Sequence, residues 1–498
     1  MIDLIALAIQ HALRPAVIAN DKTYTYQDIL DASFRVAAAL LQDTDDLQEA
    51  RVGYMISPGI DYVAVQWGIW RAGGIAVPLC ISHPIPALQY TIADSGVTTV
   101  IADHEYLHLF KPWVSVQGIR LIGLPSTDHT IVGYRALPDI LQARRAMILY
   151  TSGTTSLPKG VVTTHDHIKA QVTTLVSSWQ WSSEDSILCV LPLHHVHGII
   201  NVVTCALWSG ARLEFLHPFS VEQLFTILLS GRINLFMAVP TIYFKLITYW
   251  ELLPAHEQRK CSEALSKFRL MVSGSAALPE SIMNKWKAIS GHTLLERYGM
   301  TEIGMGISNP YDGDRKTGYI GLPLPGVSVR LMDDHHTVVT DDHPGEIQIK
   351  GANVFNEYWN KPEATFTSFT ADGWFKTGDI AILEHGYYKI LGRDSIDIIK
   401  SGGYKISALE IEEVLREYPA IQDCSVIGIP DEEWGEVVAA VLVPYHNIMD
   451  LDLINPWIKS KLPGYKCPRL YKIVPELPRN AMGKVTKNDL KILFIKKA

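Results

Sequence analysis

Short apolar runs alternate with helical patterns between residues 52 and 290 of this chain. Several of the runs end in turns rich in glycine, serine and threonine. The runs are 52–57, 74–80, 146–152, 186–193, 233–240 and 268–275, and helical patterns such as 220–230 and 279–290 lie between them. Strands that alternate with helices predict largely parallel sheets covered by helices. Ligands of such sheets bind beyond the carboxyl ends of the strands, so we expect the chemistry in the turns that follow these runs.

The pattern changes in the segment GRDSIDIIKSGGYK at 392–405. It is followed by a compact α+β pattern with helices at 407–418 and near 451–461 and strands at 424–430 and 437–445. A chain of 498 residues is also too long for one ordinary core. We therefore predict an α/β fold with a large N-terminal domain of largely parallel, helix-covered sheets at 1–393. A small, mobile α+β domain is predicted at 394–498, with a hinge near 397.

The net charge and the spacing of the cysteines limit which binding partners and which cell compartment are expected. The formal net charge of −8 argues against binding to nucleic acid or to an anionic membrane. The six cysteines form no CxxC pair, so their spacing predicts neither a zinc motif nor a disulfide framework. No apolar run reaches the length of a membrane span, and the first residues read as a helix and not as a targeting segment. We expect a cytoplasmic enzyme of small-molecule substrates with no obligate protein partner.

The segment YTSGTTSLPKG at 150–160 directly follows an apolar strand. Its glycines, hydroxyl residues and lysine offer N–H groups, O–H donors and a cation to a phosphate chain. It is not a Walker loop, because its lysine follows a proline and leads into another β-like run. The residues expected to bind phosphate are Thr151, Ser152, Gly153, Thr154, Thr155 and Lys159.

This segment resembles the phosphate-binding signature of the acyl-adenylate-forming superfamily, which includes acyl-CoA synthetases, adenylation domains of nonribosomal peptide synthetases and firefly luciferase. The family's other signatures follow in the same order, and the resemblance covers essentially the whole chain. They are GSAALP at 274–279, ERYGMTE at 296–302, DGWFKTGD at 372–379, GR at 392–393 and PRNAMGK at 478–484. The resemblance implies an acyl-CoA synthetase that uses ATP, Mg²⁺ and CoA and forms an acyl-adenylate before the thioester.

The residues of these motifs have roles that fit their chemistry. Tyr298 offers a flat face for stacking on adenine, and the resemblance places Gly274, Ser275, Ala276 and Gly299 in the same pocket. Thr301 and Glu302 supply oxygen ligands for the α-phosphate and for Mg²⁺. Asp379 and Arg393 can bind the ribose hydroxyls. By resemblance, Lys484 is the catalytic lysine, which bridges the substrate carboxylate and the α-phosphate.

The resemblance also implies a moving C-terminal domain, because in the family this domain rotates between adenylate formation and thioester formation. Asp397 occupies the position of the hinge residue, in a charged and glycine-flanked stretch. The next residues are expected to line the tunnel for the pantetheine arm of CoA, since their glycines permit close backbone approach. They are Ser401, Gly402, Gly403 and Tyr404.

Arg297 precedes the stacking tyrosine, where many relatives have a glycine or another small residue. An arginine beside an apolar acyl pocket is costly to desolvate unless an anion meets it, and a second carboxylate on the substrate would do so. The stretches LPLHHVHGIINVV, MAVPTIY, MVSGSAALP and LLERYGMTEIGM closely resemble malonyl-CoA synthetases. That resemblance implies that Arg297 holds the distal carboxylate of malonate or methylmalonate, with Ser273 and His197 as polar neighbours and Lys245 as a second cation.

Other interpretations share most of these motifs. Arg297 could instead form an internal salt bridge with Glu296 or Glu302, and the substrate would then be a short- or medium-chain monocarboxylate. A standalone adenylating enzyme that loads a carrier protein and a luciferase-like oxygenase have nearly the same signatures. A degenerate adenylate sensor is the binding-module alternative, although every catalytic position is filled.

Overall fold

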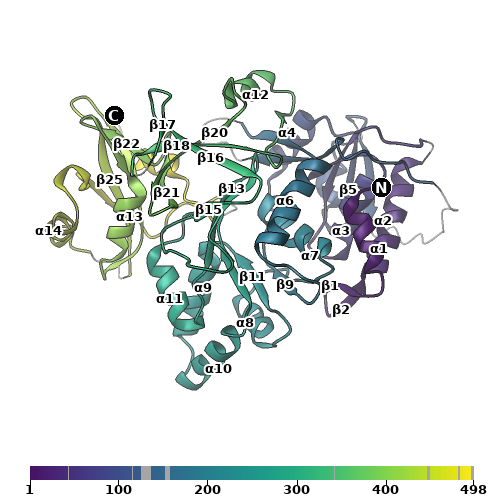
Figure 1. The fold of residues 1–498 in the computed structure, drawn as a ribbon, viewed down its shortest axis with the longest axis horizontal. Helices are drawn as coiled ribbons and strands as arrows, with labels where there is room; N and C mark the ends of the chain where they lie inside the picture. Colours follow the sequence, from purple (N-terminus) through teal and green to yellow (C-terminus); the bar gives the residue numbers. More distant parts are fainter. Residues whose placement is uncertain are drawn as a thin grey trace.

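The structure, a computed structural model, describes residues 1–42, 44–114, 116–124, 136–151, 157–340, 342–445, 449–480 and 483–494. Two large sheets with their helices and a third, smaller sheet form the first part of the chain. The last hundred or so residues form a separate small sheet, which lies at the opposite end of the molecule from the N-terminus (Figure 1).

The largest sheet has nine strands, and the six in its middle run parallel. At one edge two further strands, and at the other edge one, each pair antiparallel with the strand next to them. In spatial order the strands are β15 (Leu322–Pro323), β14 (Gly304–Ser308), β13 (Leu295–Met300), β12 (Leu270–Ser273), β11 (Leu235–Ala238), β9 (Ser186–Cys189), β10 (Arg212–Phe215), β1 (Pro15–Ala19) and β2 (Lys22–Thr25). The predicted strands at 186–193, 233–240 and 268–275 are β9, β11 and β12.

A second sheet has seven strands, of which five are parallel and two, at one edge, are antiparallel. In spatial order they are β19 (Glu357–Tyr358), β8 (Lys159–Thr164), β7 (Arg145–Thr151), β4 (Ile75–Pro78), β3 (Arg51–Met55), β5 (Thr99–Asp103) and β6 (Arg120–Leu124). The predicted strands at 52–57, 74–80 and 146–152 are β3, β4 and β7. The phosphate segment 150–160 connects β7 to β8, and its residues Ser152, Gly153, Thr154 and Thr155 lie outside the described residues.

Helices cover both faces of these sheets, as predicted. Two of them, α3 and α6, lie between the sheets, since each contacts a strand of both. Helix α3 is buried from Tyr62 to Trp70, as its apolar sequence requires. The helices of this part are α1 (Asp3–Gln10), α2 (Tyr26–Leu41), α3 (Ile60–Arg71), α4 (Ile85–Ser95), α5 (Leu107–Phe110), α6 (His165–Ser178), α7 (Cys205–Trp208), α8 (Val221–Leu229), α9 (Pro240–Glu251), α10 (Ala255–Leu265), α11 (Glu280–Ser290) and α12 (Pro362–Ser368).

The third sheet is antiparallel throughout, which differs from the expectation of largely parallel sheets. Its connections are mostly too short for a crossover helix, and β20 and β21 are joined by His385 and Gly386, both with positive φ. The strands are β17 (Val338–Val339), β16 (Val327–Met332), β18 (Gly345–Gly351), β20 (Phe375–Glu384) and β21 (Tyr387–Arg393).

The C-terminal part has its own sheet and core. Strand β25 pairs with β24, β22 and β26, and helices α13 and α14 pack on one face through Ile411, Leu415, Ile454 and Ile458. Its elements are β22 (Ile398–Ser401), β23 (Tyr404–Ser407), α13 (Ala408–Arg416), β24 (Ile421–Asp431), β25 (Gly435–Pro444), α14 (Leu451–Lys461), β26 (Leu470–Ile473) and α15 (Lys487–Lys491). The chain changes sheets between β21 and β22, although the exact boundary at 393 and 394 stays a prediction. Among the described residues no helix is long and apolar enough to span a membrane.

Candidate active site

Strand β13 carries Arg297 into the interior of the large domain. The side chain is 3% exposed, and its Nε and Nη2 have no hydrogen-bond partner among the described residues. Burial lowers the pKa of Arg297 to about 9, and the nearby charge of Glu296 opposes this shift. A buried guanidinium without a partner is costly, so the site is suited to an anion that would complete its hydrogen bonds.

Glu296 does not neutralise this arginine, because successive residues of a strand point to opposite faces. Its Oε1 accepts a hydrogen bond from the Leu278 N–H at 3.3 Å, and burial raises the pKa of Glu296 to about 8, with Glu413 and Glu280 adding to the shift. Within the part of the chain that the structure describes, no carboxylate oxygen lies within 4.0 Å of an Arg297 nitrogen. The structure thus does not support the internal salt bridge with Glu296 or Glu302.

Gly274 and Ser275 follow the end of β12 and lie beside Arg297 and His197. A Cβ on Gly274 would lie 2.5 Å from Cζ of Arg297, so the guanidinium passes directly over this glycine. Oγ of Ser275, a residue with φ +72°, lies 3.0 Å from Nδ1 of His197. His197 is 2% exposed and begins a π-helix, His197–Thr204. Burial and then the Arg297 charge hold the pKa of His197 well below 6.5, so its ring is neutral.

Two predicted acyl-site residues are not brought to Arg297. Ser273 stands opposite Glu296 in the parallel pairing of β12 and β13, so it shares the face of Glu296. Lys245 is exposed on α9, and its Nζ lies 5.3 Å from the ring centre of Phe219. Their roles stay predictions without support from these contacts.

Tyr298, Asp379 and Arg393 form one connected group. The Tyr298 hydroxyl donates to Oδ2 of Asp379 at 2.6 Å, and Nε of Arg393 lies 3.1 Å from Oδ1 of the same carboxylate. Strands β20 and β21 fix this pair, because Asp379 and Arg393 are opposite each other in their register. The residue pair expected to bind ribose and the tyrosine expected to stack on adenine thus meet at one place. Gly299 lies close by, and a Cβ there would be 2.0 Å from the Gly304 carbonyl oxygen.

Glu302 is buried beside Tyr358, a residue of strand β19. The Tyr358 hydroxyl donates to Oε1 of Glu302 at 2.8 Å, while Oε2 has no partner among the described residues. Burial raises the pKa of Glu302, opposed by Tyr358, Arg393 and Lys159. Nζ of Lys159 lies 4.9 Å from the ring centre of Tyr358. A buried carboxylate oxygen left without a partner fits Mg²⁺, which takes one or two carboxylates and keeps waters.

Lys484 reaches this group from the C-terminal part. Its loop packs on α9, because Gly483, with φ +75°, leaves room for Thr241, whose Oγ1 would lie 2.9 Å from a Cβ there. Lys484 is accessible to solvent. The surrounding protein partly desolvates the ammonium, and this desolvation lowers the pKa of Lys484. The charge of Asp379 opposes the shift, and the charges of Arg393 and Arg297 add to it. The cations gathered here suit a substrate with several negative charges.

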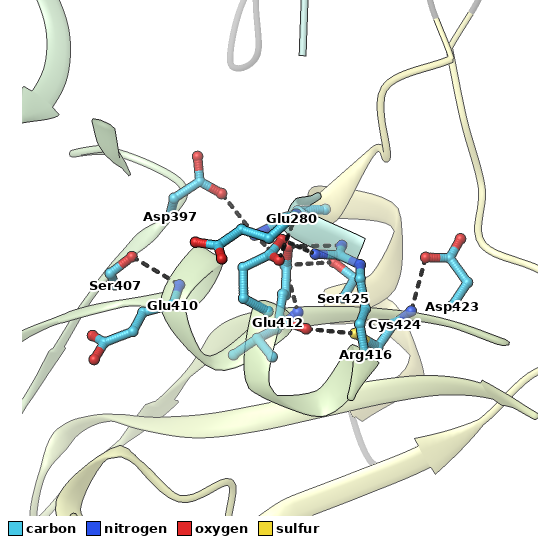
Figure 2. A network of polar contacts seen from close by, with 12 residues as sticks. Glu280, Asp397, Ser407, Glu410, Glu412, Arg416, Asp423, Cys424 and Ser425 are labelled. Atoms are coloured by element: carbon cyan, nitrogen blue, oxygen red, sulfur yellow. Dashed lines mark hydrogen bonds and ion pairs between the residues drawn. The ribbon is translucent and has the colours of Figure 1, made fainter. Parts of the chain in front are cut away.

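The predicted hinge residue, Asp397, is held by two contacts. Its Oδ2 accepts from the Arg393 N–H at 3.1 Å, and its Oδ1 lies 2.6 Å from Nζ of Lys487. The same buried ammonium lies 2.8 Å from Oε1 of Glu412 on α13. Figure 2 shows Asp397 and Glu412 of this network together with Arg416, whose Nη2 lies 3.4 Å from Oε2 of Glu412. Lys487 thus links Asp397 to the segment that carries Lys484.

Glu413, next on α13, contacts the large domain. The N–H of Glu280, the first residue of α11, donates to Oε2 of Glu413 at 3.1 Å. A carboxylate at a helix N-terminus accepts from an N–H that lacks a partner within the helix. This contact favours the present arrangement of the two parts of the chain.

The residues predicted to bind CoA form the turn between β22 and β23. Gly402 and Gly403 have positive φ, and a Cβ on Gly402 would lie 2.9 Å from the Trp434 ring. Tyr404 is 56% exposed and stacks on Tyr465, and Ser401 is buried at the end of β22. Their contacts are thus within the C-terminal part, and the role in binding CoA stays a prediction.

Sequence reasoning missed Tyr358, Lys487 and Glu412. Tyr358 lies 56 positions after the carboxylate that it contacts, and no local pattern marks it. Lys487 follows Lys484 by three residues but stands between Thr486 and Asn488, and its partners are far away in the sequence, so no local pattern marks it either.

Two family models and several known proteins match most of this chain. The model of the AMP-binding enzyme family matches residues 7–359, and that of the AMP-binding enzyme C-terminal domain matches residues 410–484. The mitochondrial malonate–CoA ligase ACSF3 of Bos taurus is 44% identical over 517 residues, covering 96% of this chain and 88% of that protein.

Solved structures are similar over nearly the whole length. ATP-bound MatB from Rhodopseudomonas palustris has a TM-score of 0.91 at 32% identity and covers 99% of both chains. A malonyl-CoA ligase in a ternary product complex with methylmalonyl-CoA and AMP has a TM-score of 0.67 at 32% identity, with 94% of this chain and 97% of that chain covered. Both proteins are 32% identical to this chain, so the higher TM-score means that the present arrangement is closer to ATP-bound MatB than to the product complex. The chain belongs to the AMP-binding enzyme family.

Proposed function

We propose that this chain is an AMP-forming malonate–CoA ligase, which joins malonate to AMP and then transfers the malonyl group to CoA. The observation that carries the choice of acid is the buried Arg297 guanidinium, whose Nε and Nη2 lack partners among the described residues. A monocarboxylate would leave this charge desolvated and unpaired, whereas a second carboxylate would satisfy it. The names of the relatives, malonate–CoA ligases at 44% identity, support the same substrate. Methylmalonate would present the same two carboxylates.

In the first half-reaction, one carboxylate oxygen of malonate attacks the α-phosphorus of ATP, and pyrophosphate leaves. Lys484 would stabilise the charge that develops on the phosphoryl oxygens, while Arg297 holds the far carboxylate in place. The neutral ring of His197 adds no further charge beside Arg297. Tyr298, Asp379 and Arg393 would hold the nucleoside.

Mg²⁺ is proposed at the unpartnered oxygen of Glu302, where it would neutralise the phosphate charge. The Tyr358 hydroxyl fixes the other oxygen of this carboxylate and so orients it toward one position. Lys159 is placed beside the same tyrosine and would add a second positive charge on the phosphate chain.

In the second half-reaction, the CoA sulfur attacks the carbonyl carbon of malonyl-adenylate, and AMP leaves. We propose that the C-terminal part rotates about Asp397 before this step, so that the turn from Ser401 to Tyr404 takes the place of the Lys484 loop. The higher TM-score with the ATP-bound structure than with the product complex supports the view that the present arrangement belongs to the first step.

The test is a substrate panel. Purified enzyme is given ATP, Mg²⁺, CoA and either malonate, methylmalonate, acetate or octanoate, and release of AMP is followed. We expect kcat/KM for malonate to exceed that for acetate by roughly thirty-fold or more, because only malonate can form the buried charge pair with Arg297. Sustained AMP release should require CoA. Preference for acetate or octanoate would contradict the dicarboxylate, and turnover with a carrier protein but not with CoA would favour a carrier-loading enzyme.

The compartment also stays a prediction. The sequence favours a cytoplasmic enzyme, whereas the vertebrate relatives are described as mitochondrial. Fractionation of cells that express the chain with a C-terminal tag would decide between the two.

A further inference from the structure

Three side chains that the proposed reaction does not use meet beyond the ends of β4 and β9, one strand from each of the two large sheets. Cys80 and His83 lie in the segment between β4 and α4, and His194 lies between β9 and the π-helix. One potential ligand atom from each lies within 4.8 Å of the other two. Segments more than a hundred residues apart therefore place a thiol and two imidazoles together.

The burial of the Cys80 side chain and of Nε2 of His194 favours a bound cation over an accidental contact. Cys80 is 3% exposed and makes no disulfide, and Nε2 of His194 is buried without a hydrogen-bond partner among the described residues. A buried ring nitrogen with no partner is costly unless a ligand completes it. The third member, His83, is exposed and opens the cluster to solvent, which gives an ion a path of entry.

One sulfur and two imidazole nitrogens select a particular class of ion. Mg²⁺ and Ca²⁺ prefer oxygen ligands, whereas Zn²⁺ binds thiolate and imidazole at about 2.0–2.3 Å. Three protein ligands leave a fourth tetrahedral position for water or an anion. Ligand atoms within 4.8 Å of one another need only small side-chain rotations to reach a common ion.

We propose that Cys80, His83 and His194 form a Zn²⁺ site with three protein ligands and one open position. The cysteine spacing along the sequence gave no sign of it, because the only other ligands are two histidines, one of them from a distant segment. The site lies next to the proposed active site, since His194 precedes His197 by only three residues, and its ring lies against that of His195, tilted by 47° with centroids 4.0 Å apart.

Cobalt titration of the full chain, stripped of metal and without nucleotide, tests this site. We expect Co²⁺ to saturate at one equivalent, with visible bands of tetrahedral intensity and a thiolate-to-cobalt charge-transfer band. Zn²⁺ should then displace it. Cys80→Ser should abolish the charge-transfer band, and His83→Ala should weaken Co²⁺ binding by about ten-fold or more.

Cys467→Ser is the matched control. Cys467 is also buried and free, and its thiol bonds to the carbonyls of Leu462 and Pro463, which a serine hydroxyl would keep. This variant should titrate like the parent. Because His83 is exposed, His83→Ala is expected to fold, and circular dichroism checks each variant. No saturable Co²⁺ binding, or a charge-transfer band that survives Cys80→Ser, would overturn the proposal, as would titrations that neither ligand substitution changes.

Discussion

The guanidinium of Arg297 lies directly over Gly274, with room for no side chain between them: a Cβ on the glycine would be 2.5 Å from Cζ and 2.6 Å from Nη1 of the arginine. Gly274→Ala should therefore displace Arg297 without removing its charge. A misplacement of about 1 Å costs up to about a hundred-fold in rate, so we expect kcat/KM for malonate to fall by roughly ten- to a hundred-fold. Steady-state kinetics with malonate measures this effect.

Gly464→Ala is the control for this change, because no atom lies within 4 Å of a Cβ there and the residue does not need a positive φ. It should leave kcat/KM unchanged. Butyrate, which has no distal carboxylate, should respond weakly to Gly274→Ala. An equal loss for malonate and butyrate would show that Gly274 serves the nucleotide and not the placement of Arg297.

Breaking the contact between Lys487 and Asp397 should impair the first half-reaction. Lys487→Met leaves the buried Glu412 and the partly buried Asp397 without their shared cation, which costs about 3–5 kcal/mol where no rearrangement relieves it. Asp397 then no longer helps to hold the present arrangement of the two parts of the chain. We expect malonate-dependent exchange of pyrophosphate into ATP to fall about ten-fold or more, with a smaller effect on thioester formation from supplied malonyl-adenylate.

Two variants separate this effect from general damage. Lys459→Met removes an exposed lysine of α14 and should change neither activity. The double variant Lys487→Met with Glu412→Gln removes one of the two stranded charges and should recover part of the lost stability. Equal loss of both half-reactions in Lys487→Met, with intact circular dichroism, would contradict a role in the hinge.

Local sequence patterns predict the strands and motifs of this fold, but they do not predict contacts between distant segments. The apolar runs located β3, β4, β7, β9, β11 and β12 because buried parallel strands leave a local signal. Arg297 was found because it stands in a recognisable motif. The pairs Glu302 with Tyr358 and Asp397 with Lys487 join distant segments, so only the fold reveals them. The resemblance to malonyl-CoA synthetases implies a role for Ser273 beside Arg297, but Ser273 pairs with Glu296 and shares its face of the sheet, so that role stays a prediction.

Glu296 should make stability depend on pH. Burial raises its pKa to about 8, so between its ordinary pKa of about 4.3 and that value the folded state holds a proton that the unfolded state releases. Stability should thus fall as pH rises through this window. Glu296→Gln, which stays neutral and keeps an acceptor for Leu278, should gain about 1–3 kcal/mol near pH 8.5 and almost nothing near pH 5.

Thermal melting across this pH range measures the difference between the two proteins. Glu363→Gln, an exposed change on α12, should melt like the parent at every pH. Glu280 and Glu413 face the same carboxylate and add to its shift, and Arg297 opposes it, so their charges are kept intact in this experiment. A gain that is the same at pH 5 and pH 8.5 would mean that the folded protein holds Glu296 ionised throughout.

Lys484→Ala should abolish adenylate formation selectively. Its charge is needed while pyrophosphate leaves, so exchange of pyrophosphate into ATP should fall roughly a hundred-fold or more. Thioester formation from supplied malonyl-adenylate should change by less than about three-fold. Lys472→Ala, an exposed change on β26, is the control. Parallel loss of both half-reactions would count against two successive domain arrangements.

Arg297→Leu separates a dicarboxylate enzyme from a monocarboxylate enzyme. Truncation of one partner in a buried, hydrogen-bonded charge pair costs about 2–5 kcal/mol, so kcat/KM for malonate should fall by roughly thirty-fold to a few thousand-fold. Butyrate should lose little or gain, because an unpaired cation no longer faces its methyl group. The decisive quantity is the ratio of the two specificity constants before and after the substitution. If kcat/KM falls by the same factor for malonate and for butyrate, Arg297 has a structural role only. The assignment of a dicarboxylate substrate then loses its main support, whereas membership of the AMP-binding family is unaffected.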